Sequence, residues 1–225
     1  MVKTNRQTFT LATMCLGTFM AILDTSLVNL GLHSIQADLH ADMATLQWVI
    51  DLYNLAYAVL ILTGGTLGDL YGRRRIFVLG VLLFAAGSLV CAVAPGAATL
   101  LAGRGIAGIG AALLLPTALA ILNVTYPDAG QRARAIALWG GMNGLAMAIG
   151  PTIGGVLVAS LGWRSLFYAI LPVAGTTLAF GGDRARAPIR KPVTMWSSRF
   201  TDLRIDQDTS NALFSSVVYG SEVRS

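Results

Sequence analysis

Charged side chains are scarce in this sequence, and they are gathered into short segments. Lys, Arg, Asp and Glu make up 12% of the 225 residues, against about 25% in an ordinary soluble domain. Hydrophobic residues account for 55%, and the mean hydropathy is +0.66. These values indicate an integral membrane protein surrounded by lipid. The formal net charge of +5 does not indicate a nucleic-acid partner, because the cations lie in loops and a C-terminal tail rather than along one face.

Cysteine is nearly absent, and no motif for a metal or a cofactor has a usable context. Cys15 and Cys91 both lie inside apolar runs, so we expect packing roles rather than a disulfide or a metal site. Residues 103–108 match the dinucleotide fingerprint G-x-G-x-x-G, but they lie within an apolar helix and lack the preceding strand that the fingerprint needs. Serine-hydrolase, zinc-protease and phosphate-loop motifs are also missing. We therefore expect no enzyme activity, no metal and no cofactor.

The chain is organised around a short polar turn at residues 64–75, which ends in three consecutive arginines. Apolar runs at residues 46–67 and 76–94 flank the turn, and each is long enough to cross a hydrocarbon core roughly 30 Å thick. Cationic loops are retained on the cytoplasmic face, so the turn is predicted to be cytoplasmic. Gly64, Gly68 and Gly72 recur four residues apart, which favours close approach of helices.

Six membrane spans are predicted, in an all-α fold. Their approximate ranges are 9–32, 46–67, 76–94, 98–123, 136–161 and 165–181. The first span resembles a signal peptide but lacks a small-x-small cleavage site, so we expect it to be retained. Fourteen of the 16 Lys and Arg residues fall on one side of these spans. This distribution predicts a multi-pass protein of the plasma membrane with both termini in the cytoplasm.

Two regions follow from this division of the chain. Residues 1–181 would form the six-span part, grouped as three plus three helices in an inverted repeat, as in transporter halves. Residues 182–225 are predicted to form a polar, poorly ordered cytoplasmic tail, because charges recur every few residues and no apolar run is long enough to span. Connections are expected at residues 33–45 outside and at residues 126–135 inside.

Three ionisable residues lie inside predicted spans, namely Asp24, Asp51 and Arg104. A charge in this position costs about 2.5–3.5 kcal/mol on insertion scales, so each is a candidate functional residue. Counting at 1.5 Å per residue places them roughly 8–12 Å below the outer surface, in one layer. A carboxyl group there can take up a proton when desolvated and release it beside a guanidinium. The layer is therefore either a proton-coupled binding site or a static ion pair that neutralises itself.

The polar turn also resembles the loop that joins the second and third helices in the major facilitator superfamily. The residues that carry the resemblance are Gly65, Leu67, Asp69, Gly72, Arg73, Arg74 and Arg75. In that family the acid and the arginines form a cytoplasmic gate, which implies the same role for Gly65, Asp69, Gly72 and the three arginines here. Leu70 stands where the family usually has a basic residue, so the gate has one cation fewer.

Further segments resemble the drug:proton antiporters of this superfamily, in particular the fourteen-span branch. Residues 23–29 resemble the first-span signature, residues 48–53 the start of the second span, and residues 104–111 the fourth-span signature, with Ala107 in place of the usual glutamine. The resemblance implies proton-coupling or substrate-binding roles for Asp24, Asn29, Asp51 and Arg104. The fifth span resembles the antiporter signature at Gly144, Gly150, Pro151, Gly154 and Gly155.

The resemblance covers about residues 9–180 and implies the N-terminal half of a multidrug efflux antiporter. Such a protein exchanges protons for lipophilic or cationic small molecules. Because only one set of six spans is predicted, we expect a truncated or half-sized unit that pairs with a second six-span half or with another copy of itself. The alternative is a non-transporting membrane remnant or a helper subunit that docks on another half.

Overall fold

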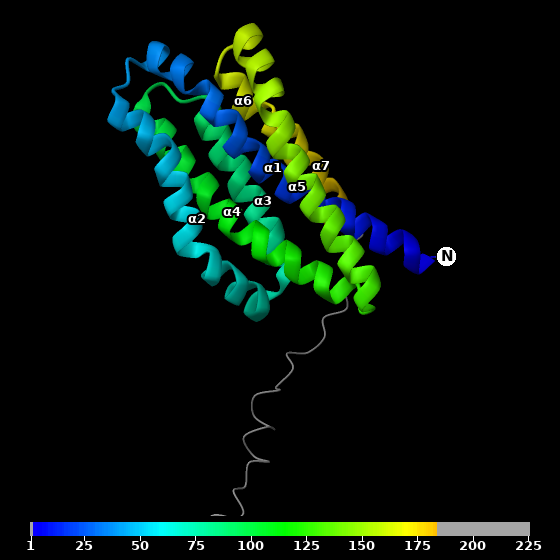
Figure 1. Cartoon of the computed structure of the whole chain (residues 1–225). Coiled ribbons are helices and arrows are strands. Elements are labelled where there is room, and N and C mark those ends of the chain that lie inside the picture. Colours follow the sequence, from blue (N-terminus) through cyan, green and yellow to red (C-terminus); the bar gives the residue numbers. More distant parts are fainter. Residues whose placement is uncertain (1, 184–225) are drawn as a thin grey trace, which may run out of the picture. The chain divides into compact units, whose positions relative to one another are not determined.

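The computed structural model describes residues 2–183, and the regular structure in this range is entirely helical. The predicted tail lies, from residue 184 onward, outside the described residues. The helices, shown in Figure 1, are α1 (Val2–Leu39), α2 (Met43–Tyr71), α3 (Arg73–Ala92), α4 (Ala97–Thr125), α5 (Ala129–Leu161), α6 (Arg164–Tyr168) and α7 (Ile170–Asp183).

Five of these helices, α1 to α5, are long and apolar enough to cross a membrane. The sixth predicted span is helical but divided into α6 and α7, with Ala169 between them. Pro172 lies two residues into α7. Proline has no backbone N–H, so it leaves the carbonyl of Tyr168 without its usual helical donor. The interruption therefore coincides with the position at which the sequence cannot continue a regular helix.

The helices extend further than the apolar runs that predicted them. The outside connection expected at residues 33–45 consists of residues 40–42 alone, because α1 continues to Leu39 and buries Ile35. His40 then adopts a positive φ of 50°, and Asp42 caps α2 by accepting a hydrogen bond from the backbone N–H of Thr45 at 2.9 Å. Hydrogen bonds from Thr45 lower the pKa of the Asp42 carboxyl below its ordinary value.

The two predicted inside loops are also shorter than expected. Arg73, Arg74 and Arg75 form the first turn of α3, and Gly72 alone reverses the chain. Gly72 has a φ of 100°, a conformation that glycine adopts without steric cost. The loop expected at residues 126–135 ends at Asp128, which caps α5 by accepting a hydrogen bond from Gln131. A single left-handed glycine and a capped helix start thus replace longer loops.

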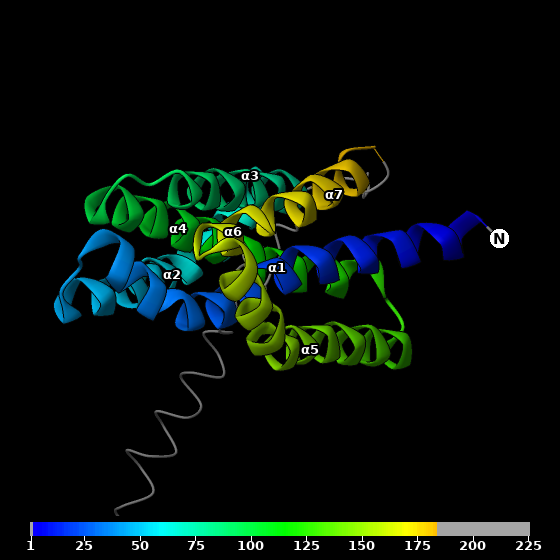
Figure 2. The ribbon, with the colours of Figure 1, turned by 90° about the horizontal axis from the view of Figure 1, so that it is seen from above.

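Helix α4 is central to the packing, with α2 and α3 against it, while α5 and α7 pack mainly on α1. Figure 2 shows α5 on one side of α1, and α3 and α7 on the other. Two hydrophobic clusters result. The larger one joins residues of α1 to α7 and includes Met20, Phe77, Phe84, Leu114 and Leu122. The smaller one lies near the connection of α1 to α2 and includes Val28, Ile35, Val49, Leu100 and Trp163.

Glycines bring α3 and α4 into backbone contact. A Cβ atom added at Gly110 of α4 would lie 2.5 Å from the backbone nitrogen of Phe84 and 2.8 Å from the carbonyl oxygen of Gly80. At Gly87 of α3, the added atom would lie 2.5 Å from the backbone nitrogen of Ala107. The neighbouring atoms are backbone and cannot move aside without moving a helix, so the α3–α4 distance depends on these glycines.

We predict that Gly110→Ala lowers the stability of the bundle by about 1–3 kcal/mol, because the methyl group overpacks the α3–α4 contact. The matched control is Gly140→Ala on α5, where an added Cβ would have no neighbour within 4 Å. That substitution is expected to be neutral or to stabilise by about 0.5–1 kcal/mol. Unfolding of the purified chain in detergent measures both. Equal stability of the two variants would contradict this account of the α3–α4 contact.

Candidate functional site

A fully buried ion pair joins α1 to α4. The Nη1 atom of Arg104 donates to Oδ2 of Asp24 at 2.6 Å, and each side chain is only 2% exposed. Removal of one partner from a buried pair costs about 3–5 kcal/mol, because the other charge is left uncompensated. Two of the three ionisable residues that the sequence placed inside spans are therefore in direct contact.

Helix α2 supplies the remaining contacts of the Arg104 guanidinium. Its Nε atom donates to the carbonyl oxygen of Val49 at 2.9 Å, and its Cζ atom lies 4.3 Å from the centre of the Tyr53 ring. The Tyr53 hydroxyl in turn donates to the carbonyl of Ala21 on α1 at 3.4 Å. Arg104 thus has one charged partner, on α1, and two neutral partners, on α2.

The small residues around Arg104 allow this enclosure. A Cβ atom added at Gly103 would lie 2.5 Å from Sγ of Cys91 on α3, and one added at Gly108 would lie 2.5 Å from the carbonyl oxygen of Tyr53 on α2. Both neighbouring helices therefore approach α4 closely on either side of the guanidinium. Larger residues at these positions would hold the helices apart and admit solvent or lipid to the pair.

Asp51 does not contact this pair, although the α2 residues two positions before and after it, Val49 and Tyr53, both contact Arg104. Asp51 is exposed on α2, whereas Val49 and Tyr53 on either side of it are buried. Residues four apart share a helix face, and a residue midway between them is rotated by roughly 200°. Counting residues along a helix gives depth, but it does not give the direction in which a side chain points.

Asn29, predicted to bind substrate or to take part in coupling, is exposed on α1. Its Nδ2 atom donates to the carbonyl of Thr25, one turn earlier, at 3.0 Å. Asn29 is therefore separate from the Asp24–Arg104 pair in its contacts, and it presents its side chain at the surface of the described bundle.

The residues predicted to form a gate connect three helix ends. Arg73 pairs with Asp69, with Nη2 and Oδ1 2.8 Å apart, and also donates to the carbonyl of Ala120 near the end of α4 at 2.9 Å. Arg74 donates twice to the carbonyl of Gly181 in α7, at 3.0 and 2.7 Å. We call Asp69, Arg73 and Arg74 the arginine cluster. Cations near a helix C-terminus are favourable because the carbonyls there carry partial negative charge.

The remaining predicted gate residues make fewer contacts. The adjacent Gly68, predicted only to favour close helix packing, is buried beside Thr117 of α4, where an added Cβ would lie 2.9 Å from the threonine methyl group. Gly65 has more space, with its nearest neighbour at 3.9 Å. Arg75 is exposed, and no hydrogen bond or ion pair joins it to another residue in the described range. Within the triplet, Arg73 and Arg74 thus make the contacts between helices.

The glycines of the antiporter signature divide into two groups. Gly150 and Gly154 face α1, where an added Cβ would meet Ser26 or would lie 3.0 Å from a methyl group of Leu30. The Ser26 hydroxyl also donates to the carbonyl of Met147 at 3.3 Å. Gly144 and Gly155 have no neighbour within 4 Å of an added Cβ, and Pro151 is exposed within a continuous α5. One face of the signature packs on α1, and the other is free of contacts within the described bundle.

A second cluster of polar contacts, at the opposite end of the helices from the arginine cluster, was not predicted. Asp38 of α1 accepts hydrogen bonds from Arg164 at 2.6 Å and from the Trp163 indole at 3.0 Å. Arg164 also donates to the carbonyl of Ala94 beyond α3 at 3.0 Å and lies over the Trp163 ring. We call these four residues the Trp163 clasp. The signal was present in the sequence, because Arg164 is the only cation expected outside and residues 33–45 contain acids but no cation.

Known proteins similar to this chain are transporters and resistance proteins. The chain is 44% identical over 172 residues to the multidrug resistance protein Stp of Mycobacterium tuberculosis. These aligned residues cover 76% of this chain and 32% of that protein. It is 40% identical over 168 residues to the methylenomycin A resistance protein of Bacillus subtilis. The alignment covers 75% of this chain and 36% of that protein. The chain thus spans about a third of the length of the curated relatives it matches.

Among solved structures, the peptide transporter POT in complex with sulfate superposes with a TM-score of 0.72 at 16% identity, over 96% of this chain and 47% of that one. This likeness shows the fold alone. The family model of the Major Facilitator Superfamily matches residues 14–220. The matched range continues past residue 180, where we had expected the resemblance to end. The chain belongs to the Major Facilitator Superfamily of membrane transporters and is a multi-pass membrane protein.

Proposed function

We propose that this chain forms the N-terminal half of a proton-coupled antiporter of the fourteen-span type, which exports lipophilic and often cationic drugs across the plasma membrane. The names of the relatives, multidrug resistance and methylenomycin A resistance proteins, support drug export. The observation that carries proton coupling is the buried contact of Asp24 with Arg104. The Asp24 carboxylate carries a charge that one proton can neutralise. Its contact with Arg104 lies where α1, α2 and α4 meet.

Protonation of Asp24 would change the balance between these helices. In the ionised form, Asp24 compensates Arg104 and holds α1 to α4. A proton on the carboxyl group removes the charge from α1, while Arg104 keeps the Val49 carbonyl and the Tyr53 ring on α2. The guanidinium is then under-compensated, which favours a conformation in which water reaches it. Proton uptake thus weakens the α1–α4 contact and leaves the α2–α4 contact in place.

The proposed topology has six spans in a three-plus-three arrangement, with both termini in the cytoplasm. In it, α6 and α7 together form the sixth crossing, since they follow one another with only Ala169 between them. The arginine cluster lies at the cytoplasmic end, as the positive-inside rule requires, and the Trp163 clasp lies at the outer end. Lipid covers the apolar outer faces.

A second six-span half, or a second copy of the chain, is the proposed partner. Only 17% of the most apolar stretch of α2 and of α5 is buried, against 61% for α1 and α4. The exposed face of α5 carries Gly144, Pro151 and Gly155, whose small size suits helix contact rather than lipid contact. These two helices therefore form the proposed pairing surfaces. On α2 the same exposed side also presents Asp51, which we propose as a contact for the charge of a cationic substrate.

The coupling proposal predicts different effects at the two acids. Asp24→Asn should reduce proton-driven export at least tenfold, because the carboxyl group that would carry the proton is lost. Asp51→Asn should raise the KM for a cationic substrate by up to about fivefold, the effect of one exposed charge, and should leave the dependence on the proton gradient intact. Export of tetraphenylphosphonium from everted vesicles measures both.

The vesicles should contain this chain alone or together with the segment that follows the matched region in the Stp relative. Export that requires the second segment supports the pairing proposal, and export by neither preparation would contradict the transport proposal. Proton-driven export that survives Asp24→Asn would exclude a coupling role for this carboxyl group.

The gate proposal predicts that Arg73→Gln impairs export several-fold more than Arg75→Gln. Arg73 connects α2, α3 and the end of α4 through Asp69 and Ala120, whereas Arg75 makes no such contact in the described range. Both substitutions remove one positive charge from the same turn, so topology is affected equally. Cysteine-accessibility labelling of α4 and initial export rates provide the measurements. Equal loss in the two variants would mean that only net charge matters here.

A further inference from the structure

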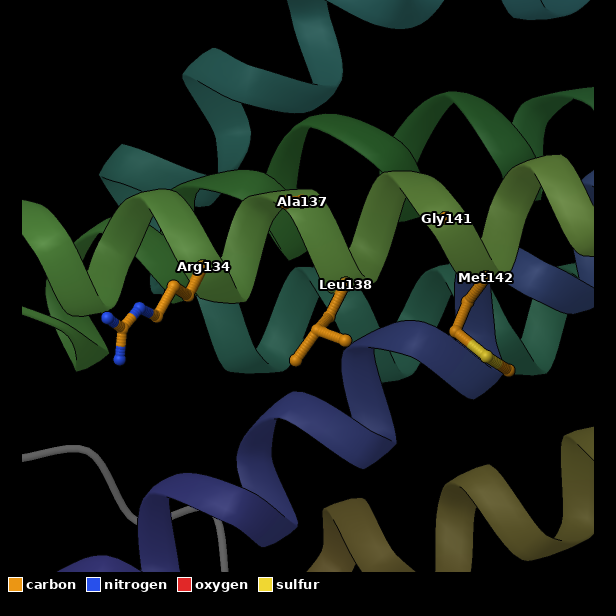
Figure 3. A pocket seen from close by; sticks show the side chains of 5 residues that line it. All are labelled: Arg134, Ala137, Leu138, Gly141 and Met142. Carbon is orange, nitrogen blue, oxygen red and sulfur yellow. The ribbon is translucent and has the colours of Figure 1, made fainter.

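Two depressions in the described bundle differ in how they are built. One, of about 560 Å³, is lined by α5 alone, through Arg134, Ala137, Leu138, Gly141 and Met142 (Figure 3), and belongs to the pairing surface proposed for that helix. A smaller pocket, of about 190 Å³, combines the outer part of α1 with the connection of α5 to α6. It is lined by Ser34, Asp38, Leu161, Gly162, Trp163 and Arg164. We call it the clasp pocket, because three residues of the Trp163 clasp line it.

The clasp uses only part of the hydrogen-bonding capacity of its two charged groups. Trp163 and Arg164 both donate to Oδ2 of Asp38, and Oδ1 accepts no hydrogen bond from another residue in the described range. Arg164 donates through Nη1 and Nη2, which leaves three of the five guanidinium N–H groups for a ligand. The Asp38 and Arg164 side chains are 48% and 38% exposed. The pocket therefore offers a negative acceptor beside positive donors.

The balance of charge at the pocket favours a ligand that carries both signs. Asp38 and Arg164 neutralise one another, so a simple anion or cation would compete with one of them for the other. A phosphate accepts charge-assisted hydrogen bonds from arginine, while a primary ammonium donates to Oδ1 of Asp38. A quaternary ammonium has no N–H group and is held in proteins by open aromatic faces. The Trp163 ring is buried and has Arg164 over it, so a primary ammonium fits better.

The surroundings of the pocket suit a lipid rather than a small soluble molecule. Tryptophan is enriched where the hydrocarbon of a membrane meets the headgroups, and Trp163 comes directly after Gly162, the cap of α5. Leu161 lines the same pocket and is 72% exposed. An apolar surface thus adjoins a polar pocket, as a headgroup with attached acyl chains requires.

We propose that the clasp pocket binds the headgroup of a phospholipid with a primary ammonium beside its phosphate, as in phosphatidylethanolamine. The phosphate accepts from Arg164, and the ammonium donates to Asp38 and to the Ser34 hydroxyl, while an acyl chain lies along Leu161. The bound lipid joins α1 to the connection of α5 to α6. This site goes beyond the proposed function, and its place in the outer leaflet follows from the proposed topology. Binding of the lipid does not depend on transport.

Native mass spectrometry of the purified full chain in detergent tests this site. The chain is given equal amounts of phosphatidylethanolamine and phosphatidylcholine with the same acyl chains. We expect it to retain phosphatidylethanolamine about tenfold over phosphatidylcholine, the effect of one hydrogen bond between charged groups. Asp38→Asn should lower this ratio below about twofold, and Ser34→Ala should lower it about threefold, the effect of a neutral hydrogen bond. Ser34→Ala removes no contact of the clasp, so it tests recognition where Asp38→Asn also weakens the ion pair.

Asp42→Asn is the matched control. It removes the same charge from the same end of the bundle, but Asp42 caps α2 and does not line the pocket. Asparagine caps a helix about as well as aspartate, so the ratio should stay unchanged. Free phosphoethanolamine at the concentration of the lipids should leave the bound lipid in place, and its displacement of the lipid would show a site for a soluble zwitterion instead. Equal retention of the two lipids by the unsubstituted chain, or a ratio that neither pocket variant changes, would overturn the proposal.

Discussion

The contact between Asp24 and Arg104 is the interaction on which the arrangement of α1, α2 and α4 depends. Either charge alone inside the membrane would cost about 2.5–3.5 kcal/mol on insertion scales, so the two must stay within reach of one another. Glycines of α4 make this possible, since Gly103 and Gly108 let α3 and α2 approach the backbone on either side of the guanidinium. The pair is thus both a cause of the helix arrangement and a result of it.

Arginine side chains perform a second task at the ends of the helices. Arg73 and Arg74 donate to carbonyls of α4 and α7, and Arg164 donates to the carbonyl of Ala94 beyond α3. Each places a positive charge at or near the C-terminal end of a helix, where the carbonyls carry partial negative charge. Of these helices, α3 is joined at both ends, through Arg74 to α7 and through Ala94 to Arg164. A movement of α3 relative to α6 and α7 would therefore have to break one of these contacts.

The course of the chain could be predicted from the sequence because apolar length and the position of cations are one-dimensional properties. The apolar runs located α1 to α5, and the arginine triplet marked a reversal of the chain. The lengths of the connections were overestimated, because a helix continues past the apolar run wherever side chains such as Ile35 are buried against neighbouring helices. Gly72 also reverses the chain in one residue, which a count of polar residues does not reveal.

The candidate site was predictable only in part. Asp24 and Arg104 stand out because charge is rare in apolar runs, and depth placed them together. Depth also placed Asp51 with them, but its side chain is exposed and does not contact the pair, because the direction of a side chain depends on which face of α2 packs on α4. The Trp163 clasp could have been found from charge alone.

These placements put the proposed proton site and the proposed substrate contact on different helices. The proton site is centred on α4, whereas Asp51 lies on the exposed side of α2. Coupling between them must then pass through elements that belong to both. Helix α2 carries Asp51 between two residues that hold Arg104. Helix α1 carries Asp24 two residues before Ser26, whose hydroxyl donates to α5. A proton on Asp24 would loosen α1 from α4 while α1 remains packed on α5, so α1 and α5 would move together relative to α4.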